Sequence, residues 1–187
     1  MFLQKKNWNE IRKWLHKNNL DKDENIWLID IDDTLIKCSS YIGSSAWFDK
    51  EIKKNKTPEM VIFGWIEMIP FLNFELCCDW LPSFINSLRG EVIAVTARHC
   101  AAQKYSHKHL ENNGFDNIST IISCGNIPKE CMVTYYIQPN RLKTYIFVDD
   151  KKKNVLKMHK QFPNMICIWI NEQISWRSKL YFNLFGT

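Results

Sequence analysis

Three aspartates, Asp30, Asp32 and Asp33, fall within four positions of the sequence, directly after the apolar residues 26–29. Carboxylates packed this densely repel one another unless a cation or a proton relieves their charge. Two other apolar runs also end in polar residues: Thr96 follows EVIAV, and Asp149-Asp150 follow TYIFV. If these runs are adjacent parallel strands, their carboxyl ends meet at the sheet edge where such folds bind ligands.

A crevice that collects four or five carboxylates predicts a divalent cation. Because hard oxygen ligands suit Mg²⁺, we expect a magnesium ion held in part by Asp30 and Asp149, with a phosphate beside it. Asp150 is expected either to support the metal ligands from behind or to cap a helix, and we favour support of the ligands.

The same residue types predict phosphoryl chemistry. Asp30 could attack a phosphorus atom in line and form an aspartyl-phosphate. Asp32 could protonate the leaving oxygen and then activate the water that hydrolyses this intermediate. Thr96 offers a hydroxyl to a phosphoryl oxygen, although taken alone it would be interpreted as a helix cap.

A lysine is also required, because the charge on the nucleophile and on the transferred group must be balanced. We expect Lys129, at the start of the helix before the fourth strand, and Lys143 and Lys151 are the alternatives. Arg98 is expected either to bind an anionic group of the substrate through its forked guanidinium or to form a surface salt bridge.

Hydrophobic patterning predicts strands that alternate with helices. The expected strands are 26–30, 91–96, 118–123, 144–149 and 165–170, and the expected helices are 7–18, 58–68, 82–88, 101–113, one from about 129, and 151–162. Alternation of this kind predicts an α/β fold, a Rossmann-like three-layer α/β/α arrangement around a central parallel sheet.

The chain of 187 residues is expected to form a single domain, residues 1–187. Residues 38–90 are expected to form a small helical, cap-like insert between the first two strands. Trp8, Trp14 and the aromatic residues of the C-terminal tail are expected to cover the sheet.

Composition narrows the function classes. The net charge of +5 mildly favours anionic partners, but no nucleic-acid-binding motif is present. No signal peptide and no membrane-spanning segment is expected. The seven cysteines form no C-x-x-C pair, which favours reduced thiols and a cytoplasmic location, with signal-less export left open. The expected partner is a phosphorylated substrate, small or macromolecular.

The motifs D-x-D-D-T-L, V-T-A-R, a lysine and F-V-D-D, in this order, resemble those of the haloacid dehalogenase superfamily. The matching residues, which lie between positions 26 and 155, are Asp30, Asp32, Thr34, Thr96, Lys129 and Asp149-Asp150. The resemblance implies Mg²⁺-dependent phosphoryl transfer through an aspartyl-phosphate, with the metal bound by Asp30, the Asp32 backbone carbonyl and Asp149. It also implies that Thr34, like Arg98, lies near the substrate. Dehalogenases of this superfamily lack the second aspartate, so Asp32 argues against carbon–halogen chemistry.

The segment IDIDDTLIKCSSYIGSSAWF is also similar to a bacterial subfamily of unassigned function, whose first motif reads D-I-D-N-T-L and is followed by an L-G-S-D-Q-W-F-like stretch. Three departures stand out: Asp33 replaces an asparagine, Ser45-Ala46 replace D-Q, and Glu130 follows Lys129 where glycine is expected.

The function expected from these features is Mg²⁺-dependent hydrolysis of a phosphomonoester. Two alternatives remain: a phosphotransferase of the same fold, and a non-catalytic metal-binding module with a regulatory or interaction role.

Overall fold

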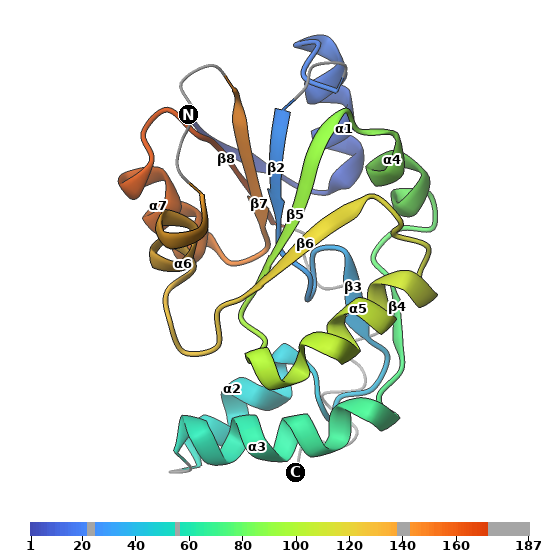
Figure 1. Cartoon of the computed structure of the whole chain (residues 1–187), viewed down its shortest axis with the longest axis vertical. Coiled ribbons are helices and arrows are strands. Elements are labelled where there is room, and N and C mark those ends of the chain that lie inside the picture. The colour runs from blue at the N-terminus through green and yellow to red at the C-terminus, as the bar shows by residue number, and fades with distance from the viewer. Residues whose placement is uncertain (22–24, 55–56, 138–142, 172–187) are drawn as a thin grey trace.

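A six-stranded parallel sheet forms the centre of the protein (Figure 1). The structure is a computed structural model that describes residues 1–21, 25–54, 57–137 and 143–171. The strand order is β1-β8-β7-β2-β5-β6. The strands are β1 (Phe2–Lys5), β2 (Asn25–Ile29), β5 (Gly90–Thr96), β6 (Ile118–Ser123), β7 (Tyr145–Asp149) and β8 (Ile166–Ile170). The α/β fold with a parallel central sheet, predicted from the sequence, is confirmed.

Helices cover both faces of this sheet (Figure 1). On one face lie α1 (Trp8–Lys17), α4 (Leu81–Ser87) and α5 (Gln103–Asn112), the last preceded by the short 3₁₀ helix η2 (Cys100–Ala102). On the other face lie α6 (Lys129–Tyr136) and α7 (Lys152–Gln161). The protein is therefore built as three layers, helix on sheet on helix.

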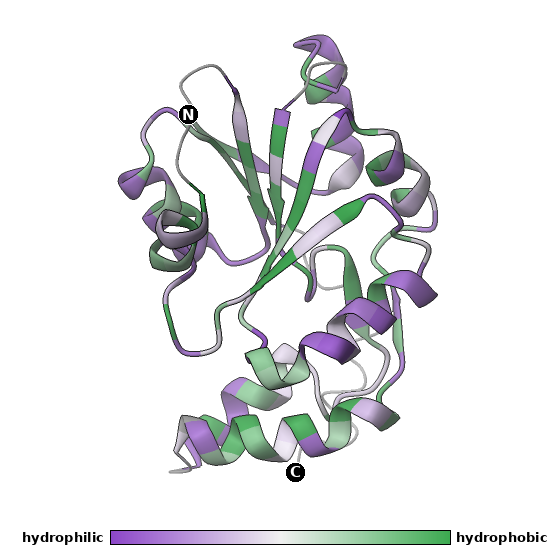
Figure 2. Cartoon of the chain, in the orientation of Figure 1, coloured by the Kyte–Doolittle hydropathy of each residue, from purple (hydrophilic) through white to green (hydrophobic). Residues whose placement is uncertain are grey.

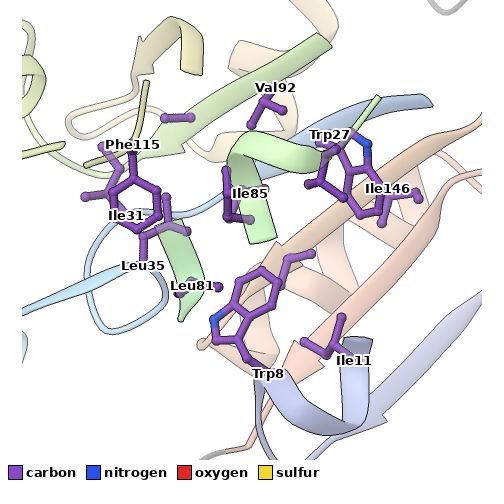
Figure 3. Packing of buried hydrophobic residues seen from close by; sticks show 14 of the residues in the cluster. Trp8, Ile11, Trp27, Ile31, Leu35, Leu81, Ile85, Val92, Phe115 and Ile146 are labelled. Carbon is purple, nitrogen blue, oxygen red and sulfur yellow. The ribbon is translucent and has the colours of Figure 1, made fainter. Parts of the chain in front are cut away.

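The core follows the two-residue period of the strands. Trp27 and Ile29 belong to the cluster on the α1 and α4 face, whereas Ile26 and Leu28 belong to the cluster under α6 and α7. Figure 3 shows Trp8 and Ile11 of α1, Leu81 and Ile85 of α4, and Trp27 of β2 within the cluster on this face. The central strand β2 is consequently apolar on both faces, and hydrophobic colour is frequent along the inner strands in Figure 2.

Local sequence signals explain the helix starts. The Asn7 side chain accepts a hydrogen bond from the Glu10 backbone N–H at 3.1 Å, as expected for the cap of α1. Thr57 caps α3 (Pro58–Met68) through the Met60 N–H. Both α3 and α4 carry a proline in their first turn, where its missing N–H is not needed.

The connection between β2 and β5 is more varied than the expected insert. It contains a two-stranded antiparallel ribbon, β3 (Ile36–Cys38) with β4 (Phe74–Leu76), and between them α2 (Ser45–Lys53), α3 and the 3₁₀ helix η1 (Ile69–Phe71). The α2 and α3 helices lie beyond the carboxyl ends of the central strands (Figure 1). By contrast, α4, included in the expected insert 38–90, packs onto the sheet because Leu81 and Ile85 are buried in its core.

A further cluster ties the insert to the main body. Trp65 of α3 and Ile69 are buried with Ala102 of η2, and the partly buried Phe74 packs against them. The indole N–H of Trp65 also donates to the Gly43 carbonyl at 2.9 Å. These contacts hold the insert against the loop that follows β5.

Gly90, the first residue of β5, has a positive φ of 90°. A Cβ at this position would overlap the backbone of Asn25, the first residue of the neighbouring strand β2. Glycine is therefore required for β2 and β5 to pair from their first residues.

The aromatic residues of the C-terminal tail were expected to cover the sheet, but the tail beyond residue 171 lies outside the described residues. In the segments that the structure describes, no helix combines the length and the apolar character needed to cross a bilayer.

Candidate active site

Three adjacent strands end in polar residues at the same edge of the sheet. Asp30 directly follows β2, Thr96 ends β5 and Asp149 ends β7, and β2 lies between the other two. In the register, Ile29 pairs with Ala94 on one side and with Val148 on the other. The convergence expected from the sequence is therefore present.

Lys129 joins two of these carboxylates. It opens α6, only 5% of its side chain is exposed, and its Nζ donates to Asp30 Oδ1 and to Asp149 Oδ2, the latter at 2.8 Å. Burial acts to lower the pKa of Lys129, but the charges of Asp149 and Asp30 outweigh it and raise that pKa. Of the three lysines considered, Lys129 contacts the acidic residues, whereas the Lys143 and Lys151 side chains are exposed.

Asp149 is fully buried and its carboxylate is saturated with donors. Besides Lys129, it accepts hydrogen bonds from the Lys151 backbone N–H at 2.7 Å and from the Asn154 side-chain amide at 3.1 Å to each oxygen. Asn154 was missed in the sequence, although its position in the first turn of the helix after β7 could have indicated it. Asp149 is thus a rigid counter-ion for Lys129.

Asp150 differs from Asp149 in this respect. Its Oδ1 is buried and accepts no hydrogen bond from any residue that the structure describes. One oxygen each from Asp30, Asp149 and Asp150 lie within 4.8 Å of one another. A carboxylate that belongs to such a cluster and keeps an unpartnered oxygen is suited to binding a cation.

The electrostatics agree with this geometry. Burial, followed by repulsion from Asp30, Asp149 and Asp33, raises the pKa of Asp150 to about 9. Burial also raises the pKa of Asp30 to about 7, with Lys129 opposing the shift and Asp149 adding to it. One buried lysine therefore does not compensate the carboxylates, and a divalent cation fits the donor set.

Asp32 lies apart from this cluster, because its carboxylate turns towards Arg98. Arg98 Nε donates to Asp32 Oδ2 at 2.9 Å and Nη2 donates to Oδ1 at 2.7 Å. Burial acts to raise the pKa of Asp32, but the charge and hydrogen bonds of Arg98 outweigh it and hold that pKa below its ordinary value. The side chain of Asp32 is consequently not among the clustered ligand oxygens, and its backbone carbonyl is the group it could offer to a metal.

Arg98 is itself buried, with 2% of its side chain exposed. Its Nη1 lies 3.2 Å from Ser106 Oγ and 3.2 Å from His109 Nδ1. Burial and the Arg98 charge lower the pKa of His109 to about 4, so the imidazole is neutral and its Nδ1 accepts from the guanidinium. The pairing of residues 32 and 98 could not be inferred from the sequence, because no spacing rule connects them.

The two threonines are held by hydrogen bonds. Thr34 is fully buried, its hydroxyl donates to Asp30 Oδ2 at 3.3 Å and its carbonyl accepts from the Trp8 indole at 2.7 Å. Thr96 is also buried and accepts from the Arg98 backbone N–H at 3.1 Å. The structure thus places Thr34 against Asp30 and Thr96 at the start of the Arg98 loop, and their roles towards a substrate remain predictions.

A tight turn sets the direction of the acidic residues. Asp33 has a φ of +59°, a left-handed conformation that aspartate tolerates better than most residues, and its N–H donates to the Ile36 carbonyl at 2.8 Å. The Ile31 carbonyl accepts from the backbone of Leu35 and Ile36 in the same turn. The chain therefore reverses within a few residues of Asp30 and leads into β3.

These features define an α/β protein whose parallel sheet carries an acidic, lysine-bridged cluster at its carboxyl edge. The chain belongs to the family described as "Protein of unknown function (DUF2608)", whose model matches residues 4–134. The matched range includes Asp30, Asp32, Arg98 and Lys129 and ends before β7.

Two solved structures are similar to the chain. One is the HAD domain of the effector protein Lem4 from Legionella pneumophila, with 15% identity and a TM-score of 0.47, covering 86% of this chain and 94% of that chain. The other is an inactive mutant of the same domain, with 15% identity and a TM-score of 0.45, covering 86% and 93%. No curated protein matches the sequence.

Proposed function

We propose that this protein is a haloacid dehalogenase-like, Mg²⁺-dependent phosphatase that hydrolyses a phosphomonoester through an aspartyl-phosphate. The observation that carries the proposal is the buried Asp30 carboxylate at the edge of the sheet, bonded to Lys129 and grouped with Asp149 and Asp150. This arrangement provides a nucleophile, a fixed positive charge and a set of oxygen ligands within one small volume.

The metal would be held by Asp30, the Asp32 backbone carbonyl and Asp150, and when bound it would neutralise charge on the phosphoryl group. Asp149 was predicted as the ligand and Asp150 as the residue behind it. We propose that these roles are exchanged, because the Asp149 oxygens already accept from Lys129, Lys151 and Asn154. The free Asp150 oxygen is the better ligand.

In the first step, an Asp30 oxygen attacks phosphorus as the bond from phosphorus to the leaving oxygen breaks. Because Arg98 holds the pKa of Asp32 low, the Asp32 carboxylate takes the proton of a singly protonated phosphate group on the substrate and passes it to this leaving oxygen. In the second step, water attacks the same phosphorus and gives a proton to Asp32. The bond from Asp30 to phosphorus then breaks and inorganic phosphate leaves. Lys129 balances the charge on Asp30 through both steps.

The test is hydrolysis of 4-nitrophenyl phosphate by the wild type, with and without Mg²⁺, beside Asp30→Asn. Asp79→Asn, which changes an exposed aspartate outside the acidic cluster, is the matched control. We expect Mg²⁺-dependent turnover that Asp30→Asn abolishes and Asp79→Asn retains. Equal rates for the wild type and Asp30→Asn would reject the proposal, and new phosphoesters formed with added alcohols would indicate a phosphotransferase instead.

A further inference from the structure

In the ion pair between Asp32 and Arg98, the Asp32 carboxylate is partly exposed to solvent and the Arg98 guanidinium is buried. Asp32 has 30% of its side chain exposed, whereas Arg98 has 2%. Both Asp32 oxygens accept from the fork of the Arg98 guanidinium. A substrate that enters from solvent therefore meets Asp32, and its anionic group could reach Arg98 only by displacing the Asp32 carboxylate.

The guanidinium is held from its remaining sides. Nη1 donates to Ser106 and His109, both on α5. The rings of Phe74 and Trp65 lie 4.7 Å and 5.5 Å from the guanidinium carbon, measured to the ring centroids. Contacts from α5, β4 and α3 thus fix both the position and the plane of the guanidinium.

We propose that Arg98 is a positioning residue, which fixes the plane of the Asp32 carboxylate for proton transfer and does not bind the substrate. This inference rests on the proposed phosphatase function. A bidentate fork fixes both oxygens of a carboxylate, while each oxygen keeps a lone pair directed away from the arginine. The Asp32 carboxylate is therefore oriented without being closed to a leaving group or a water molecule.

The insert takes part in this arrangement. Trp65 and Phe74 lie in the connection between β2 and β5, and they contact the same guanidinium that orients Asp32. A change in the packing of the insert would consequently reach Asp32 through Arg98, without any contact between the insert and the substrate.

The test separates positioning from substrate binding by measuring kcat and KM for Arg98→Lys. Lysine keeps the charge but lacks the planar fork. We expect kcat to fall by about tenfold to a hundredfold with KM changed by less than about twofold, because small misplacements of a catalytic group cost about this much. The loss should be larger with phenyl phosphate than with 4-nitrophenyl phosphate, because the poorer leaving group depends more on the proton from Asp32.

A second arm asks whether Arg98 acts through Asp32. In an Asp32→Asn background, Arg98→Lys should cause no further loss of kcat, since residues that act as one unit are not additive. Arg12→Lys, which changes an exposed arginine on α1, is the matched control and should leave both constants unchanged. If Arg98→Lys does not fold, Phe74→Leu removes one contact of the guanidinium and should show the same pattern, with a loss of only a few fold.

A rise in KM with kcat unchanged, or losses that multiply in the double variant, would overturn the inference and assign Arg98 to substrate binding. In that case the phosphatase function stands, because the wild type turns over. Absence of Mg²⁺-dependent turnover in the wild type would instead reject the proposed function, and the role of Arg98 would fall with it.

Discussion

Replacing Lys129 with methionine removes the ammonium group that bonds both Asp30 and Asp149, while keeping a side chain of similar length. Removal of one partner from a buried ion pair typically costs about 3–5 kcal/mol, because the remaining charge is left uncompensated. Lys129 has 5% of its side chain exposed, and Asp149 has none, so we expect a loss in the middle of that range, about 4 kcal/mol.

This loss converts into a change of melting temperature. For a chain of this size, 1 kcal/mol shifts Tm by about 2–4 °C, so Lys129→Met should lower Tm by about 8–16 °C at neutral pH without metal. The measurement is thermal unfolding followed by circular dichroism. Lys143→Met is the matched control, because the Lys143 side chain is exposed, and its Tm should change by less than about 2 °C.

The dependence on pH sharpens this prediction. Without Lys129, whose charge opposes the shift, the pKa of Asp30 rises further above about 7, so its carboxyl group is protonated at pH values where that of the wild type is ionised. A carboxyl group with a raised folded-state pKa destabilises the folded protein once it ionises, and this cost is larger when Lys129 is absent. The Tm difference between the wild type and Lys129→Met should therefore grow as pH rises from about 5.5 to about 8. A Tm decrease of less than about 3 °C, or one that does not change with pH, would refute the view that Lys129 neutralises this cluster.

Three further outcomes are expected. Metal-free wild type should lose stability against urea as pH rises through about 7 and about 9, because the folded-state pKa values of Asp30 and Asp150 are raised from 3.8 to those values, and saturating Mg²⁺ should reduce this loss. An unfolding midpoint that stays constant over this range would contradict it. Asp150→Asn should stabilise the metal-free protein and remove most of the thermal shift caused by Mg²⁺, whereas an unchanged Mg²⁺ shift would return the ligand role to Asp149. Trp8→Phe should lower the free energy of unfolding by about 1–3 kcal/mol, because the buried Thr34 carbonyl loses its donor. A loss no larger than that of Trp14→Phe, a change at a half-buried position, would count against this reason.

Much of the fold could be predicted because its strongest signals are local. The buried strands β2, β5 and β7 are uninterrupted apolar runs, and α1 carries its own cap in Asn7. The edge strand β1 was missed, because the four residues FLQK show neither an apolar run nor an alternation, and they are ordered by pairing with β8 at the far end of the chain. The ribbon strands β3 and β4 were missed for a related reason, since each has three residues and is defined by its partner.

For the site, too, the sequence indicates the features that depend on local signals and misses those that depend on distant contacts. Asp30, Thr96 and Asp149 could be found from the sequence because each marks the end of a strand, and the start of a helix indicated Lys129. The orientations of the acidic side chains and their hydrogen-bond partners could not be predicted from the sequence. The turn through Asp33 sends Asp32 towards Arg98, and three side-chain and backbone donors occupy Asp149 while leaving a free oxygen on Asp150. These outcomes depend on packing between segments distant in the chain.

The alignment of the site residues depends on Gly90, which lies at the opposite end of the sheet from the site. The strands that end at Asp30 and Thr96 are aligned by their contact at the opposite end, where Gly90 lies against Asn25. Any larger side chain at position 90 would overlap the Asn25 backbone and separate β2 from β5. These are the two strands that carry the nucleophile and the Arg98 loop at their carboxyl ends. A protein altered at this remote position could thus keep its overall shape and every acidic residue, and still have a misaligned site.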